Sequence, residues 1–305
     1  MARFRPLPFL FLALLCCACA KKPEQPAAQA PSTASTTATD QSVHEFKIGD
    51  FTAIALKDGG LQVPNDGKTF GVGQSPEAVA KVLQAAGLAT NELSLSIQPL
   101  YVKARDKALL FDTGAGTNMG AGAGKLGTSM QQAGIDPASI TDIFISHSHG
   151  DHVGGLVDAN GALVFANATV HLSAPEWTFL KGLDDKAATN FGITHHAALI
   201  AAVTPKIDAF VPGSEIIPGT VKAVEIKGHT PGHSGYLITS GADSLLYMGD
   251  TAHHYIVSVQ EPDWTVSFDG DAPTAQASRK EVIAQSAAAG QRIYAVHFPF
   301  PGLGK

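Results

Sequence analysis

The chain has 305 residues, of which 45% are hydrophobic and 16% are charged, a balance that suits one sizeable α/β domain and excludes disorder over the whole length. Its net charge of −6 at pH 7 provides no basic surface, which excludes nucleic acid as an expected partner.

Residues 1–20 have the pattern of a secretory signal peptide. Two arginines precede a short apolar run, residues 7–15, and small residues follow at 18–20. The run is too short to cross a bilayer, since a transmembrane helix needs about 20 apolar residues. We therefore expect an exported protein, located in a bacterial periplasm or held at the membrane by a lipid.

Two ways of processing this leader remain open. Cys19 is typical of a bacterial lipoprotein attachment site, although Cys16 stands where such sites usually have leucine. Alternatively, ordinary signal peptidase cuts after Ala20. The lipoprotein is favoured, because residues 21–43 have almost no large apolar side chains and would form a disordered linker between membrane and domain. All 3 cysteines lie in the leader, so no disulfide framework is expected.

The expected domain, residues 44–305, opens with strands and one helix. The predicted elements are a hairpin of 46–55 and 60–63 with its turn at 57–60, a helix at 75–86, and paired strands at 93–102 and 107–111. A glycine-rich stretch, 114–127, then leads into a helix at 126–133. It lacks the Gly-Lys-Ser/Thr ending of a phosphate-binding loop, so nucleotide binding is not expected.

Metal-binding side chains gather at Ser146-His147-Ser148-His149-Gly150-Asp151-His152, directly after the apolar run 140–145. The run predicts a buried strand, and the glycines after it let the chain turn sharply. Imidazole and carboxylate are ligands that Zn²⁺ takes, and crowding several of them is costly unless a cation compensates. The alternative, a solvated histidine-rich loop, is disfavoured by the density of the motif.

The chain resembles the metallo-β-lactamase superfamily, in particular its lactonase and methyl parathion hydrolase-like branch. Besides the histidine motif, the family landmarks appear in order at Phe111-Asp112-Thr113-Gly114, Gly228-His229-Thr230-Pro231-Gly232-His233-Ser234, Met248-Gly249-Asp250 and Val296-His297-Phe298-Pro299. The resemblance implies a four-layer αββα sandwich of α/β class, with a metal site at one edge of the two sheets.

The resemblance also implies two divalent metal ions, Zn²⁺ being favoured over Mn, Co or Fe. The implied ligands are His147, His149 and His233 for one ion, Asp151, His152 and His297 for the other, and Asp250 bridging both. A hydroxide shared by the ions would be the nucleophile. Asp151 and Asp250 would take part in catalysis, with His253 donating a proton to the oxyanion or leaving group, although a solvated His253 remains an alternative.

Two further residues of the motifs are expected to support the ligands. Asp112 would orient a ligand imidazole or its loop, the alternative being a carboxylate that caps its own turn. His229 would be structural, in a turn fixed by Pro231 and Gly232.

The interval between His152 and His233 is long for the superfamily, and helices are predicted at 174–181 and 195–203. In the lactonase branch such an insertion covers the metal site. Trp177, Phe179 and Phe191 would then line the substrate pocket, although aromatic residues at helical spacing are equally often core residues.

The C-terminal third is predicted to alternate strands with ligand loops. Strands are expected at 221–226, 234–239, 245–248 and 292–296, with a helix at 281–289. After His297 the sequence ends at Lys305 without the further strand that relatives usually carry. We therefore expect a truncated chain or a missing final strand, with an uncovered sheet edge.

The leading functional hypothesis is an exported dinuclear hydrolase acting on a lactone, ester or organophosphate-type bond of a small molecule. Alternatives are a glyoxalase II-like thioesterase, a β-lactamase, and a non-hydrolytic iron-binding redox protein. A glutathione-binding basic run is lacking, Asp250 stands where true β-lactamases usually have Cys or Ser, and His149 stands where the iron branch usually has Glu. Contact with a membrane is expected only through a lipid anchor, and homodimerisation is left open.

Overall fold

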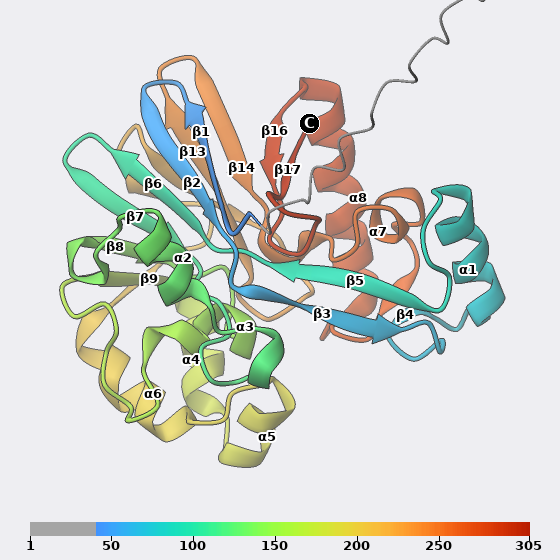
Figure 1. Ribbon diagram of the computed structural model, residues 1–305, viewed down its shortest axis with the longest axis horizontal. Coiled ribbons are helices and arrows are strands. Elements are labelled where there is room, and N and C mark those ends of the chain that lie inside the picture. Colours follow the sequence, from blue (N-terminus) through green and yellow to red (C-terminus); the bar gives the residue numbers. More distant parts are fainter. Residues whose placement is uncertain (1–40) are drawn as a thin grey trace, which may run out of the picture. The chain divides into compact units, whose positions relative to one another are not determined.

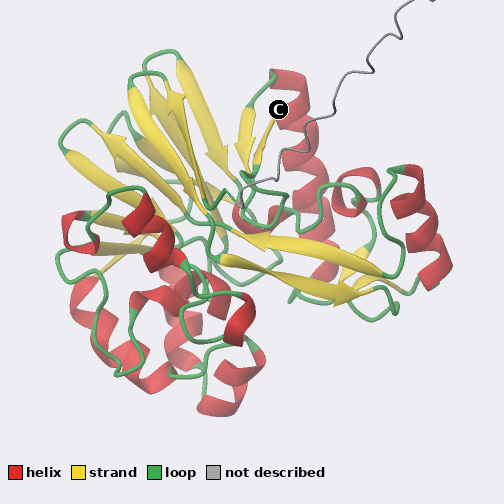
Figure 2. Cartoon of the chain, viewed as in Figure 1, coloured by secondary structure: helices red, strands yellow, loops and turns green. Residues whose placement is uncertain are grey.

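Two β-sheets face each other, and helices cover the outer face of each (Figures 1 and 2). The structure, a computed structural model, describes residues 41–305, which belong to one unit, Asp40–Lys305. The predicted signal peptide and nearly all of the predicted linker lie outside the described residues. Among the described residues, no helix has the length and apolarity needed to cross a membrane.

The first sheet has the strand order β1-β2-β6-β7-β8-β9-β10, and the second has the order β11-β12-β13-β14-β16-β17. Strands of the first sheet are β1 Val43–Ile48, β2 Phe51–Leu56, β6 Leu100–Ala104, β7 Lys107–Phe111, β8 Asp142–Phe144, β9 Thr169–Ser173 and β10 Ile207–Phe210. Strands of the second sheet are β11 Glu215–Ile217, β12 Val221–Glu225, β13 Ser234–Ser240, β14 Asp243–Tyr247, β16 Arg292–Tyr294 and β17 Leu303–Gly304.

Two small two-stranded ribbons lie beside the sandwich, β3 Gly59–Pro64 with β5 Glu92–Ile97, and β4 Phe70–Val72 with β15 Thr265–Val266. The α-helices are α1 Pro76–Ala85, α2 Leu126–Gln132, α3 Gly150–Val153, α4 Ala174–Gly182, α5 Asp185–Asn190, α6 His196–Val203, α7 Val257–Gln260 and α8 Ala272–Ala289. Short 3₁₀ turns are η1 Gly120–Gly122, η2 Pro137–Ser139, η3 Gly154–Leu156, η4 Thr204–Lys206 and η5 Gly249–Thr251.

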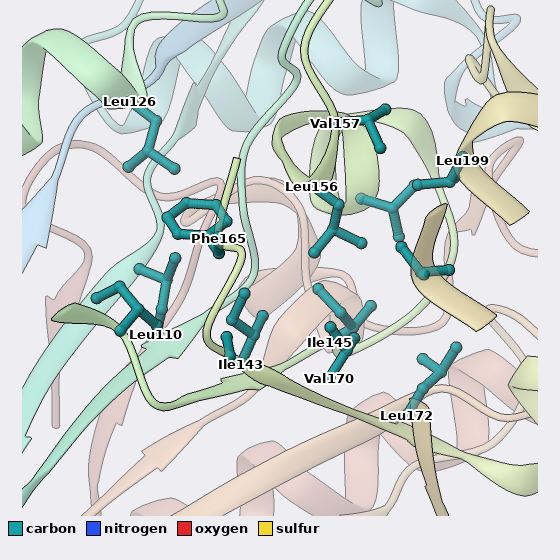
Figure 3. Close-up of a cluster of buried hydrophobic side chains, with 14 of the residues drawn as sticks. Leu110, Leu126, Ile143, Ile145, Leu156, Val157, Phe165, Val170, Leu172 and Leu199 are labelled. Carbon is teal, nitrogen blue, oxygen red and sulfur yellow. The ribbon is translucent and has the colours of Figure 1, made fainter. Parts of the chain in front are cut away.

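Strand β7 shows why the sandwich has four layers. Successive side chains of a strand point to opposite faces, and every residue of β7 after Lys107 is buried. Leu109 and Phe111 enter the cluster between the sheets, where the Phe111 and Phe144 rings stack 4.9 Å apart. Ala108 and Leu110 face the other way, into the cluster under the helices that Figure 3 shows. A sheet buried on both faces requires helices outside it, which confirms the predicted αββα architecture.

Strand direction gathers the loops that carry the histidines. Strands β7 and β8 are parallel, so Asp112 and the His147 loop follow the same end of the first sheet. In the second sheet β14 and β16 are parallel, and β12 runs the same way because β13 is antiparallel to both of its neighbours. The segments after β12, β14 and β16 therefore leave the second sheet at one edge.

The strand pairing predicted for the opening hairpin is wrong. The chain turns at Gly49, whose φ is +51°, so that β1 pairs with β2, whereas β3 pairs with β5. The supposed turn residue Asp58 is buried instead, and its carboxylate accepts hydrogen bonds from the backbone N–H groups of Ala115, Gly124 and Leu126. This carboxylate holds the glycine-rich loop, a long-range contact that a local turn pattern cannot show.

The predicted uncovered edge is also corrected. Strand β17 pairs antiparallel with β16, Ile293 lying opposite Gly304 and Tyr294 opposite Leu303. This short strand covers the edge of the second sheet. Helix α8 begins at Ala272, earlier than the predicted 281, because Asp271 caps its first turn by accepting from the Thr274 N–H.

Candidate metal centre

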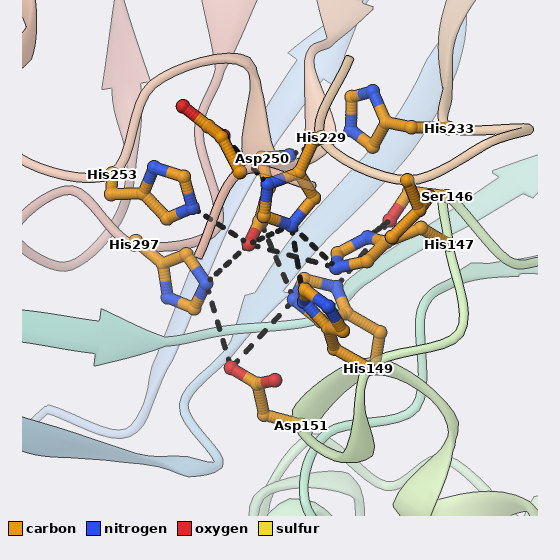
Figure 4. A network of polar contacts seen from close by, with 12 residues as sticks. Ser146, His147, His149, Asp151, His229, His233, Asp250, His253 and His297 are labelled. Atoms are coloured by element: carbon orange, nitrogen blue, oxygen red, sulfur yellow. Dashed lines mark hydrogen bonds and ion pairs between the residues drawn. The ribbon is translucent and has the colours of Figure 1, made fainter. Parts of the chain in front are cut away.

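Seven imidazole and carboxylate side chains converge where the two sheets open at one edge (Figure 4). His147 and His149 lie on the loop after β8, and Asp151 and His152 lie on α3. His229, Asp250 and His297 follow β12, β14 and β16. Gly228 and Gly249 precede two of these residues with φ of +109° and +49°, so the chain can turn each side chain inward at little steric cost.

The first group of potential ligands consists of His147, His149, His229 and Asp250. Nε2 of His229 lies 3.1 Å from Nε2 of His147 and 3.1 Å from Nδ1 of His149. Oδ2 of Asp250 lies 3.4 Å from Nε2 of His229 and 3.7 Å from Nε2 of His147. Ligand atoms on a tetrahedral Zn²⁺ at ordinary bond lengths are about 3.3 Å apart. The spacing of the group therefore fits one tetrahedral cation.

The second group consists of Asp151, His152 and His297. Nε2 of His297 lies 3.5 Å from Oδ2 of Asp151, and Nε2 of His152 lies 3.3 Å from Oδ1 of Asp250. Both Nε2 of His152 and Oδ1 of Asp250 are buried without a hydrogen-bond partner. Buried polar atoms normally have partners, so this pair of orphaned atoms fits a bound cation.

Asp250 joins the two groups. Its Oδ2 faces His147 and His229 of the first group and lies 3.2 Å from Nε2 of His297 in the second, while Oδ1 faces His152. Burial raises the pKa of this carboxyl, but the surrounding imidazoles, His297 first, outweigh burial and hold the pKa well below its usual value. The side chain is therefore a carboxylate, available to cations on both sides.

Burial prepares two histidines of the first group to bind a cation. It lowers the pKa of His147 and of His149 well below the usual value, so both imidazoles are neutral and keep a free lone pair. Burial also lowers the pKa of His229, but the hydrogen bonds that its ring donates to Asp250 and Asp269 outweigh burial and raise that pKa to about 9. The carboxylates thus favour positive charge at His229, as a proton or as a cation.

Asp112 orients His152 of the second group through a hydrogen bond. Its Oδ2 accepts a 2.7 Å hydrogen bond from Nδ1 of His152, which turns Nε2 of that ring toward Asp250. The same carboxylate accepts from the Ser146 N–H and hydroxyl and from the Tyr247 hydroxyl, each at 2.7 Å. The structure thus places Asp112 as a residue that orients an imidazole, and every partner of its carboxylate belongs to another segment of the chain.

The expected roles of His229 and His233 are reversed. Nδ1 of His233 donates to the Ile226 carbonyl at 3.0 Å, and Nε2 accepts from the Asp250 N–H at 2.9 Å. Both ring nitrogens are thereby used by the backbone, and Figure 4 shows this ring at the side of the cluster. His229 points its Nε2 into the first group instead. His233 therefore shapes the turn of Asp250, and His229 takes the place predicted for a ligand.

His253 is buried, with 1% of its surface exposed, so the alternative of a solvated side chain is wrong. Its Nε2 lies 3.2 Å from Oδ2 of Asp250, but neither ring nitrogen has a hydrogen bond of good geometry. Burial lowers the pKa of His253, which leaves a neutral ring that can accept or donate a proton.

A cleft of about 330 Å³ opens above both groups. His149, Asp151, Asp250, His253 and His297 line its floor. Its walls carry apolar side chains from five separate segments: Leu61 of β3, Leu95 of β5, Met119 of the glycine-rich loop, Phe191 after α5, and Phe268. Polar groups at the floor of an apolar cleft are typical of small-molecule sites.

Only one of the three predicted pocket aromatics lines this cleft. Phe191 does so, and its ring stacks on His149 with centroids 5.3 Å apart. Phe179 packs edge-on against Phe191, 5.3 Å away, and does not line the cleft. Trp177 is only 9% exposed and belongs to the core under the helices, so its assignment to the pocket is wrong. Helix α4 turns this side chain toward the sheet.

Three charged side chains that the sequence did not predict are buried in the site. Asp269 binds Nδ1 of His229, Arg279 binds Asp269, and Glu176 joins two ligand loops. One oxygen of Glu176 accepts from the N–H and hydroxyl of Ser148, and the other accepts from Thr230 and Gly232. None belongs to a motif; the one available signal was a glutamate in the first turn of the predicted helix 174–181.

The site agrees with what comparison with known proteins shows. A family model described as "Metallo-beta-lactamase superfamily" matches residues 98–295. No curated protein matches the chain. Among solved structures, AidC, a dizinc quorum-quenching lactonase in complex with a product, is 30% identical with a TM-score of 0.80, over 86% of this chain and 92% of that one.

Two further solved structures are similar along most of the chain. The hydrolase AbOPH of the beta-lactamase superfamily is 27% identical with a TM-score of 0.76, over 86% of this chain and 92% of that one. A probable metal-dependent hydrolase from Staphylococcus aureus is 21% identical with a TM-score of 0.68, over 83% and 91% of the two chains. The latter is similar in fold alone.

Proposed function

The chain belongs to the metallo-beta-lactamase superfamily and is a metal-dependent hydrolase, and from this membership we propose that it opens the ring of a lactone with two divalent ions, Zn²⁺ first among them. The observation that carries the proposal is the Asp250 carboxylate at the floor of an apolar cleft: its Oδ2 faces the first potential ligand group and His297, and its Oδ1 faces His152 of the second group. The similarity to a dizinc lactonase supports the choice of bond.

The residues would divide the work as follows. His147, His149 and His229 would hold one ion, Asp151, His152 and His297 the other, and Asp250 both. When bound, two such ions lower the pKa of water, polarise a carbonyl oxygen and stabilise the charge that develops on it. Asp112 and Asp269 keep Nδ1 of His152 and His229 protonated, so that each Nε2 presents its lone pair.

His253 would handle the proton of the leaving group. It lines the cleft, lies outside the two groups just named, and has no good hydrogen bond on either ring nitrogen. A lactone that opens generates an alkoxide, which needs a proton. The apolar walls would hold the remainder of the substrate and exclude bulk water from the floor.

The test is a substrate panel with measured metal content. Purified protein would be loaded with Zn²⁺, and kcat/KM would be compared for lactones, aryl phosphotriesters, thioesters and β-lactams. We expect about two ions per chain and the highest kcat/KM for a lactone. A protein with two ions that prefers a thioester, a phosphotriester or a β-lactam would overturn the substrate assignment, and a protein that binds only one ion would overturn the dinuclear site.

Export through the leader is proposed on sequence grounds, with Cys19 as the lipid attachment point. Labelling with a radioactive fatty acid in a bacterial host should mark the wild-type protein and not a Cys19→Ala variant. A wild-type protein that is processed after Ala20 and carries no label would show the soluble alternative.

A further inference from the structure

A single buried guanidinium lies behind the first ligand group. Arg279 projects from α8 with none of its surface exposed. A fully buried arginine is rare and costly unless all of its donors are satisfied. No sequence motif marks this residue, so its place in the structure needs a physical explanation.

The guanidinium makes four hydrogen bonds in different directions. Nη2 donates to Oδ2 of Asp269 at 2.7 Å, and Nε donates to the Thr251 carbonyl at 3.0 Å. Nη1 donates to the carbonyls of Pro262 and Trp264 at 3.1 and 3.3 Å. Arg279 thus fixes Asp269 on one side and, on the other, the residue directly after Asp250. Lysine could not replace it, since an ammonium lacks this planar fork of donors.

Asp269 passes this constraint to His229. Its Oδ1 lies 2.9 Å from Nδ1 of His229, and its side chain has no exposed surface. Oδ1 of this carboxylate can only accept, so it requires the tautomer that carries the proton on Nδ1. Nε2 is then left with its lone pair directed toward His147, His149 and Asp250.

The second ligand group is held by other contacts. His152 is oriented by Asp112, whose carboxylate takes its remaining hydrogen bonds from Ser146 and Tyr247. Nδ1 of His297 donates to the Ser96 carbonyl at 2.7 Å. Asp112 also reaches the first group, because the Ser146 hydroxyl that donates to it lies 3.0 Å from Nδ1 of His147. Asp269, in contrast, contacts His229 of the first group and is the carboxylate that binds the buried arginine.

We propose that Asp269 and Arg279 are positioning residues that set the cation affinity of the first group, independently of the second. The inference rests on the proposed two-ion function. Residues that orient a ligand imidazole typically change metal affinity by about 10–100-fold when replaced.

The Asp269→Asn variant tests this inference with little change in volume. If its amide oxygen keeps Arg279, its NH₂ group faces Nδ1 of His229 and forces the proton onto Nε2, the atom meant to bind the cation. Asp243→Asn is the matched control. Asp243 forms an ion pair with Arg292, with 2.9 Å between the two side chains, and this pair lies away from the histidine cluster.

The measurement is a titration of each apo protein with Co²⁺ and Zn²⁺, followed by visible absorption and calorimetry, with ¹⁵N NMR reporting the His229 tautomer. In Asp269→Asn we expect the affinity for one cation equivalent to fall about 10–100-fold and the affinity for the other to stay as in the wild type. The tautomer of His229 should switch. Asp243→Asn should behave as wild type.

An equal loss of affinity for both equivalents would show that the fold has loosened as a whole, and would overturn the proposal. Unchanged affinities for both equivalents would also overturn it. Arg279→Lys serves as a second variant in which Asp269 stays in place. The affinity for the same equivalent should fall more than the affinity for the other, which Arg279 reaches only through the backbone beside Asp250. If the wild type binds one ion only, the two-ion function fails, and the effect of Asp269→Asn on that ion still decides the role of Asp269.

Discussion

Replacing Trp177 with alanine should destabilise the protein and leave substrate binding unchanged. The indole is 9% exposed within the core between the first sheet and its helices, and the Lys181 ammonium lies 5.1 Å from the ring centroid. Truncating a buried tryptophan costs about 3–5 kcal/mol in the free energy of unfolding. At about 2–4 °C per kcal/mol for a domain of this size, the Tm should fall by about 6–20 °C.

Phe191→Ala provides the matched contrast, because this ring lines the cleft and packs on His149. Losing its apolar contact with a hydrophobic substrate should cost about 1–3 kcal/mol, or about 5–150-fold in KM. Small polar lactones, which do not reach the ring, should be affected much less.

The assay combines a thermal melt with KM for one long-chain and one small lactone, in both variants. Trp177→Ala should shift Tm and change KM less than about twofold, whereas Phe191→Ala should do the reverse. A Trp177→Ala protein with unchanged Tm and a KM raised only for the long-chain lactone would refute the core assignment and return this indole to the pocket.

Three further predictions concern the buried polar network. His229→Ala should release one of two zinc equivalents on dialysis while His233→Ala retains both, as metal analysis would show; the opposite pattern would restore the sequence assignment. Glu176→Gln places an NH₂ group where one carboxylate oxygen accepts two hydrogen bonds, so urea unfolding should show a loss of about 2–4 kcal/mol, and an unchanged midpoint would contradict the clamp between the two loops. Burial raises the pKa of Asp142, but hydrogen bonds from His171, Lys107 and Thr141 outweigh burial and lower that pKa. The stability that Asp142 contributes is therefore fully present above its unfolded pKa of about 4, and it is lost as the pH falls below that value. The gap in unfolding free energy between wild type and Asp142→Asn should accordingly shrink from pH 6 to pH 3; a constant gap would contradict this linkage.

Much of the fold follows from local patterns in the sequence. Helices α1, α2, α4 and α6 lie within one or two residues of the predicted ranges, because each has a capping residue, a proline or a glycine near its end. The strands before Asp112, His147 and Asp250 were visible as short apolar runs. The order of strands in a sheet is not local, which is why β3 was paired with the wrong partner.

The errors in the site share one physical cause. His229 and His233 lie in the same short turn, and the choice between them depends on Gly228 and on Asp269, which is 40 residues away from His229. Likewise, the periodicity of α4 shows that Trp177 lies on a helix but not which face of the helix meets the sheet. Contacts between distant segments decide such cases, and a pattern within one segment does not contain them.

The separation of wall from floor in the cleft has an evolutionary consequence. The floor is built by loops at the strand ends, whereas the walls are contributed by segments such as β3, β5 and the loop at Met119. A substitution at Leu61 or Met119 alters the shape offered to a substrate without removing any hydrogen bond that orients an imidazole of the floor. Mutation can therefore explore new substrates one residue at a time while the hydrolytic machinery is inherited intact. Descendants of such a protein would diverge first in the substrates that they bind and last in the residues that carry out hydrolysis.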